Sequence, residues 1–89
     1  MERAYLGESF IQVFDMFDAD DKTRRVDSAT FKVVVNGETV QEGSLSMDDS
    51  GHVGSFRFVA DHVGVHQITV TYRMGDDVWR TPFLMEVLG

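Results

Sequence analysis

Residues 51–74 read GHVGSFRFVADHVGVHQITVTYRM, and this stretch decides the fold class. Largely apolar and polar residues alternate from position 66 to 74, and the largely apolar parity consists of His66, Ile68, Val70, Tyr72 and Met74. Because strand side chains point alternately to opposite faces, this pattern predicts a half-buried strand with one apolar and one solvated face. A shorter alternating run, Phe56–Val59, precedes it, and residues 61–65 join the two. We therefore expect a tight pair of strands at the centre of a β-sandwich.

Turn signals divide the flanking sequence into further short strands. Asn36-Gly37, two residues that tolerate positive φ, follows an alternating run at 30–35 and predicts a hairpin. The returning arm is expected to break at Gly43, with another short strand at 44–47. In the closing run 78–88, Pro82 cannot donate to a ladder, so it marks a sheet edge or a break in the strand.

Residues 1–28 give weaker signals. Residues 1–7 are expected to be a lead-in, and residues 18–28 a charged loop. Between them, 10–17 (FIQVFDMF) carries apolar residues on both parities, and both a strand and a helix fit its spacing. Its aromatic and β-branched residues favour the strand, with a bulge or a change of sheet explaining the two apolar faces.

Length and composition limit the classes of protein to consider. Eighty-nine residues predict a single domain over 1–89, and about seven short strands without a convincing helix predict an all-β sandwich. The net charge of −7 argues against binding to nucleic acid or an anionic membrane. The N-terminus does not resemble a secretory signal, and no run has the length of a membrane span.

The sequence lacks a recognisable catalytic constellation. It contains no Cys, and none of its serines lies in a Gly-x-Ser-x-Gly elbow. His52 follows a turn, His62 lies in a loop, and His66 takes an apolar-parity position expected of a partly buried, hydrogen-bonded core histidine. We therefore expect a protein that is not an enzyme and has no cofactor.

Two segments remain as candidate binding sites. The acidic loop containing Asp18, Asp20 and Asp21 suggests calcium, although Lys22 and Thr23 occupy the positions where an EF-hand needs an oxygen ligand and a glycine. A solvated acidic loop, partly neutralised by nearby basic residues, is the simpler interpretation. Trp79 and Arg80 are the candidate protein contact, because Trp and Arg are frequent hot spots, while a core position is the simpler interpretation for Trp79.

The order of these signals resembles that of the small immunoglobulin-like structural proteins of tailed bacteriophages. The motifs that carry the resemblance are Gly7-Glu8, Asp18–Asp21, Val26-Asp27 with Ala29–Val33, Asp49–Gly51 with Phe56 and Phe58, Gly64–Val70, and Phe83–Val87. The chain departs from the family pattern at Asp21, where a glycine is usual, and at His66, where an aromatic residue is usual. The resemblance implies an immunoglobulin-like antiparallel sandwich and no shared catalytic motif.

The function implied by the resemblance is that of a non-enzymatic virion component, either a capsid decoration protein or a head–tail or tail accessory protein. Such a protein is made in the host cytoplasm and binds other virion proteins, namely the capsid, the portal or adaptor, or the tail, within a symmetric multi-copy assembly. The alternative is a carbohydrate- or cell-surface-binding immunoglobulin-like module that uses Trp79 or Tyr72 and calcium at Asp18–Asp21.

Overall fold

The computed structural model describes residues 1–89 and contains eight strands and no helix. The strands are β1 (Glu2–Tyr5), β2 (Ser9–Asp15), β3 (Ser28–Val35), β4 (Glu38–Ser44), β5 (Ser46–Met47), β6 (Val53–Val59), β7 (Gly64–Met74) and β8 (Asp77–Leu88). None of its elements is therefore a helix suited to crossing a lipid bilayer. The all-β prediction is confirmed, with one strand more than expected.

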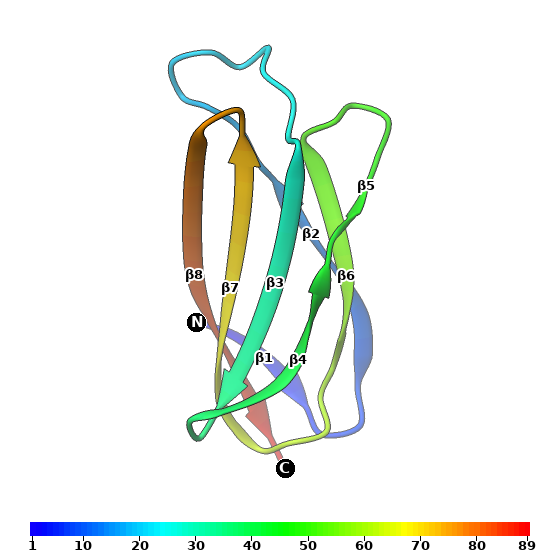
Figure 1. The fold of residues 1–89 in the computed structure, drawn as a ribbon. Helices are drawn as coiled ribbons and strands as arrows, with labels where there is room; N and C mark the ends of the chain where they lie inside the picture. Colours follow the sequence, from blue (N-terminus) through cyan, green and yellow to red (C-terminus); the bar gives the residue numbers. More distant parts are fainter.

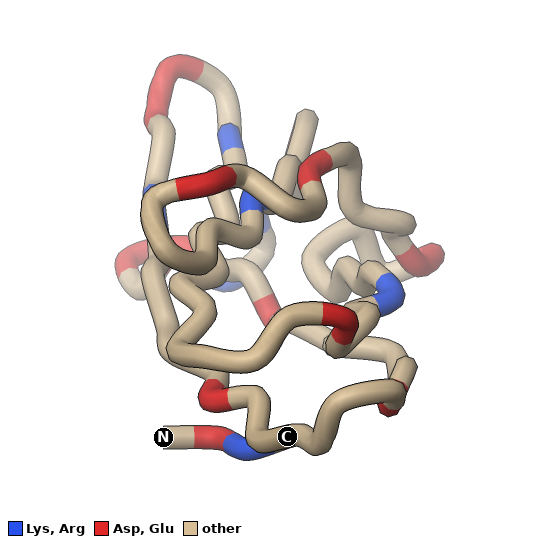
Figure 2. The backbone as a smooth tube through the Cα atoms, turned by 90° about the horizontal axis from the view of Figure 1, so that it is seen from below, with Lys and Arg blue, Asp and Glu red and all other residues tan.

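The strands form two sheets (Figure 1). One has five strands in the order β1-β8-β7-β3-β4, and the other has three in the order β2-β6-β5. This order is that of an immunoglobulin-like sandwich. The expectation of a wholly antiparallel sandwich is corrected in one place, because β1 pairs parallel with β8 and makes the larger sheet mixed. Acidic residues are spread along the backbone around the molecule rather than gathered in one segment (Figure 2).

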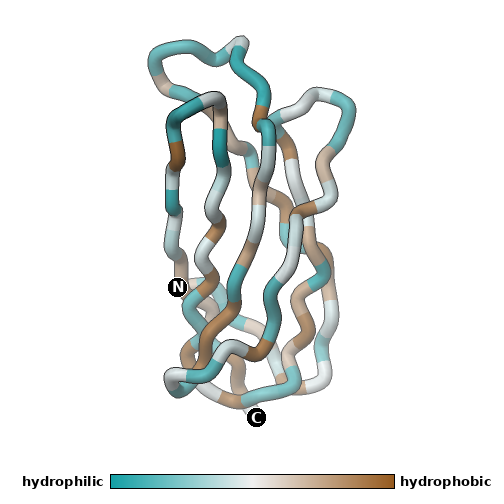
Figure 3. Tube along the Cα trace, viewed as in Figure 1, coloured by the Kyte–Doolittle hydropathy of each residue, from teal (hydrophilic) through white to brown (hydrophobic).

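The core lies between the two sheets and is built from their inward parities. Ile68 and Val70 of β7 face Phe56 and Phe58 of β6, and all four are buried. The outward parity of β7 is exposed at Val65, as the alternating pattern predicts. Brown hydrophobic segments accordingly line the body of the sandwich, while the upper loops are mostly teal (Figure 3).

The expected tight pairing of the two central runs is wrong. β6 pairs with β2 and β5, whereas β7 pairs with β3 and β8 in the other sheet. The segment 60–63 therefore crosses from one sheet to the other. Alternation identified both strands correctly but carried no information about their partners, because each strand buries one face whichever sheet contains it.

The strand interpretation of residues 10–17 is confirmed over Ser9–Asp15, and the helix, bulge and change-of-sheet interpretations are wrong. Ser9–Asp15 pairs with Val59–Val53 without a shift in register. Phe10 and Phe14 point inward, whereas Ile11 and Val13 are 49% and 63% exposed. The second apolar parity of β2 is thus a solvent-facing apolar surface.

Of the remaining expectations, some are confirmed and others are wrong. The Asn36-Gly37 hairpin is confirmed by positive φ at both residues. Residues 1–7 are more than a lead-in, because they contain β1. Gly43 lies within β4, and the chain changes sheet after it, at buried Leu45. Pro82 leaves β8 unbroken and lies beyond the part covered by β1, which confirms the edge alternative.

Candidate protein-binding surface

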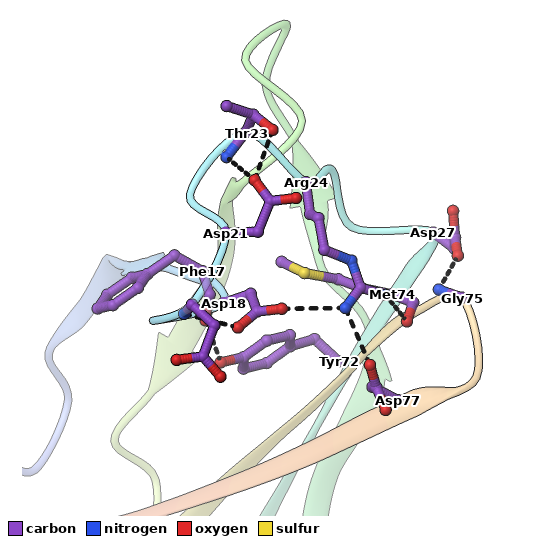
Figure 4. Close-up of polar contacts among 11 residues, drawn as sticks. Phe17, Asp18, Asp21, Thr23, Arg24, Asp27, Tyr72, Met74, Gly75 and Asp77 are labelled. Atoms are coloured by element: carbon purple, nitrogen blue, oxygen red, sulfur yellow. Dashed lines mark hydrogen bonds and ion pairs between the residues drawn. The ribbon is translucent and has the colours of Figure 1, made fainter.

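The acidic loop is tied to the sandwich by Arg24. Its Nη1 lies 3.0 Å from Asp18 Oδ2 and 2.9 Å from Asp77 Oδ2, and its Nη2 donates to the Met74 carbonyl oxygen (Figure 4). The Asp20 backbone N–H and the Arg24 guanidinium both stabilise ionised Asp18, and they lower the pKa of its carboxyl group. The loop end is therefore an internal ion-pair network that fixes residues 16–27 onto the β7–β8 turn.

The candidate calcium residues do not converge on a common point. Asp18 is occupied by Arg24, while Asp21 accepts hydrogen bonds from the backbone N–H and hydroxyl of Thr23, which lower the pKa of its carboxyl group. Asp20 is exposed. No group of three or more His, Cys, Asp or Glu side chains is arranged to hold a metal ion. The geometry favours a loop in which the carboxylates of Asp18 and Asp21 are already paired with groups of the chain itself.

Trp79 and Arg80 lie on opposite faces of the larger sheet, as adjacent strand residues must. Trp79 is half-buried on the inner side, stacked on Tyr72 with centroids 5.3 Å apart and 6.0 Å from the Arg24 guanidinium carbon. Arg80 is exposed on the outer face, where it borders a polar hollow with Thr69 and Thr71. The two residues therefore do not form one contact patch.

The three histidines have separate environments. His52 Nδ1 lies 3.1 Å from Asp15 Oδ1, and His62 Nδ1 lies 2.7 Å from Asp61 Oδ1. His66 is fully buried rather than partly buried as expected, with its Nδ1 3.0 Å from the Gly64 carbonyl oxygen, as a hydrogen-bonded core histidine requires, and its Nε2 without a partner. No serine hydroxyl contacts any histidine ring.

One long side of the sandwich is open between β2 and β8, and we call this depression the β2–β8 trough. Two adjoining hollows of about 740 and 390 Å³ form it and share the lining residues Val13, Phe14 and Phe83. The other residues lining it are Met1, Glu2, Gln12, Asp15, Met16, Phe17, Val70, Tyr72, Thr81 and Leu84. The trough is lined mainly by apolar side chains.

The trough follows from the unequal sheets. Three strands face five, so β2 covers the inner face of β8 incompletely. Phe14 and Phe83 meet there with ring centroids 5.2 Å apart, and both remain partly exposed despite pointing inward. Leu84, on the neighbouring outward position of β8, is 44% exposed at the rim.

The opposite long side of the sandwich is closed. The side chain of Gln41 reaches from β4 to β6, where its Nε2 donates to the Arg57 carbonyl oxygen and its Oε1 accepts from the Val59 N–H, both at 3.0 Å. This amide forms the hydrogen bonds that the backbone groups on this edge of β6 lack, because the short β5 does not reach them. The apolar opening is therefore confined to the β2–β8 side.

Comparisons with known proteins support the fold and do not assign a family. No family model matches the chain, and no curated protein matches it. A crystal structure of an engineered protein superposes with a TM-score of 0.78 at 12% sequence identity, covering 99% of this chain. The chain spans 18% of that engineered protein, so the likeness concerns one of its parts and shows the fold alone.

Among the trough residues, sequence reasoning singled out Tyr72, and it did so as a carbohydrate contact. Phe14 and Phe83 have inward parities and look like ordinary core positions. The available signal was the apolar outward parity of β2, at Ile11 and Val13, which a bulge or a change of sheet also explained. Uncovered core positions depend on which strands face each other across the sandwich, and one strand's periodicity does not encode that.

Proposed function

We propose that this chain is a non-enzymatic structural component of a phage virion, a capsid decoration or head–tail or tail accessory protein that acts by binding other virion proteins. The β2–β8 trough is the observation that carries the binding role. Inward aromatic residues that stay partly exposed, with apolar Val13 and Leu84 at the rim, are typical of a surface that a partner covers. The phage assignment rests on the sequence resemblance.

The alternative, a carbohydrate- or cell-surface-binding module, has less support from the geometry. Tyr72 and Trp79 stack on each other rather than presenting open ring faces, and the Tyr72 hydroxyl donates to the Phe17 carbonyl oxygen at 3.1 Å. Asp18 is engaged by Arg24. A melting temperature raised by calcium or by glycans would favour this alternative over the virion role.

The test is to probe purified particles of the phage that encodes the chain with an antibody against the recombinant protein. We expect a stoichiometric band that survives density-gradient purification, with a copy number that separates a decoration protein from a junction or tail ring. Absence of the band would refute the virion role.

Two matched variants test whether incorporation of the chain into phage particles depends on the trough. A Val13→Lys chain places a charge at its rim, whereas Val63→Lys alters a valine of similar exposure in the connection before β7. We expect Val13→Lys to be lost from particles and Val63→Lys to be retained. Equal retention of both variants would show that binding uses another surface.

A further inference from the structure

The free edge of β2 presents backbone groups ready to pair. Met16 N–H donates to His52 C=O at 2.7 Å, and Ala60 N–H donates to Glu8 C=O at 2.9 Å, so even-numbered residues direct their backbone groups to β6. The N–H and C=O groups of alternate strand residues point in opposite directions. Those of Ile11, Val13 and Asp15 therefore face away from β6, along the open side.

The β8 edge across the trough is less suited to pairing. Leu6 N–H donates to Leu88 C=O at 2.7 Å, which places the even-numbered residues of β8 toward the β1 side. Pro82 belongs to this set and has no N–H, so the uncovered edge before Leu84 is interrupted in its middle. A strand entering the trough would pair with β2.

The edge strands β4 and β5 carry protective features that β2 lacks. β4 has a register shift opposite Val33/Val34 and contains glutamates and Gly43, and β5 is two residues long. Bulges, charges and short strands are the usual means by which edges avoid pairing. β2 (SFIQVFD) is seven residues long and regular, and its only charge is Asp15 at its end.

The topology leaves room for one more strand at this place. In immunoglobulin-like sandwiches the first strand can lie beside the second and make a four-stranded sheet. Here the first strand, β1, pairs with β8 instead, and the sheet containing β2 has three strands. The position beside β2 overlies the trough, where inward side chains of an added strand would contact Phe14 and Phe83.

We propose that the β2–β8 trough accepts an extended segment of a partner protein, which adds antiparallel to β2 and completes the smaller sheet. This inference deepens the proposed role by naming the partner's chemistry. Backbone pairing with Val13 and Asp15 supplies the docking, and large apolar side chains at alternate positions fill the trough. About seven residues, roughly 23 Å of strand, match the length of β2.

The charge of the trough indicates which charged residues the partner segment should carry. Glu2 and Asp15 are the charged side chains that line the trough, and both are acidic. The whole chain, including these two residues, carries a net charge of −7. A donor segment with Lys or Arg at its ends is therefore complementary, whereas an acidic segment would be repelled.

A second copy of β2 does not fit as the donor. Its Phe10 and Phe14 are committed to their own core, with Phe10–Phe58 and Phe14–Phe56 centroids 5.6 and 5.9 Å apart. Edge-to-edge pairing of two β2 strands would leave both troughs unfilled. Filling the trough requires a segment whose apolar side chains are free to enter it.

The test tethers a donor to the intact chain. The turn at Leu6–Glu8 reverses the chain, so a segment fused before Met1 that continues the direction of β1 runs antiparallel to β2. The probe is Lys-Val-Thr-Phe-Thr-Val-Lys with a short Gly-Ser linker. We expect hydrogen exchange of the Val13 and Asp15 amides to slow at least about tenfold, as measured by NMR.

Two controls make the result specific. A donor with the same residues in a non-alternating order should give no slowing. In the host, Val13→Pro removes an N–H that faces the free edge and leaves the β2–β6 ladder intact, so it should fold and prevent the slowing at Asp15.

Three results would overturn the proposal. These are unchanged exchange at Val13 and Asp15 with the alternating donor, equal slowing with both donors, and sedimentation showing that the untethered chain dimerises with these amides already slow. Presence or absence of the chain in phage particles is measured separately, so failure of the virion role leaves this result interpretable.

Discussion

Replacing Ile68 by alanine tests the assignment of faces in β7. Ile68 is fully buried between the sheets, so the substitution removes three carbons from the core, worth about 2.4 kcal/mol of transfer free energy. A residual cavity of about 50 Å³ adds roughly 1 kcal/mol. We expect a total loss of about 3–4 kcal/mol, against a stability of about 4–13 kcal/mol for a domain of this size.

Urea unfolding followed by tryptophan fluorescence measures this loss. Trp79 is the single tryptophan, and its stacking on Tyr72 makes its emission sensitive to tertiary structure. Val65→Ala is the matched control, because Val65 lies in the same strand on the exposed parity, and it should cost less than about 1 kcal/mol. If the two variants differ by less than about 1 kcal/mol, the assignment of inner and outer faces to β7 is wrong.

Three further variants test local features. Ionised Asp18 stabilises the folded chain at pH values above its unfolded pKa of about 4, and this contribution is lost as pH falls through its lower folded pKa. The melting temperature of Asp18→Asn should therefore fall less than that of the parent chain between about pH 5 and 3. His66→Phe removes the unpartnered buried Nε2 and should raise the free energy of unfolding, measured by urea titration, by about 1 kcal/mol; a lowered value would show that the hydrogen bond to Gly64 matters more. Gly37→Val forces a β-branched residue to a φ of 78° and should cost about 1–3 kcal/mol, whereas an unchanged midpoint would contradict the observed turn.

Much of the fold was predictable because its elements are locally encoded. Alternation placed the faces of β7, and Asn36-Gly37 specified a hairpin because few residues accept two successive positive φ angles. Burial of His66 followed from its parity. The missing N–H of Pro82 predicted either a sheet edge or a break in the strand, and the edge is observed.

The errors concern relations between elements. β6 and β7 are separated by a short connection, which suits a hairpin as well as a crossover, and the partners of each strand decide between them. Glu2–Tyr5 is a strand because β8 has a free edge beside it, a condition absent from its own four residues. Nearby basic residues predicted a partly neutralised loop, but the sequence did not specify that Arg24 pairs with Asp18, at 3.0 Å.

The trough and the free edge of β2 have one origin. By pairing with β8, β1 widens the larger sheet and removes a strand from the smaller one. The same exchange exposes backbone groups at Val13 and leaves Phe14 and Phe83 incompletely covered. Hydrogen-bonding capacity and apolar surface therefore appear side by side, and an added strand would satisfy both at once. A substitution that shields only one of them should weaken partner binding without abolishing it, because the other would remain.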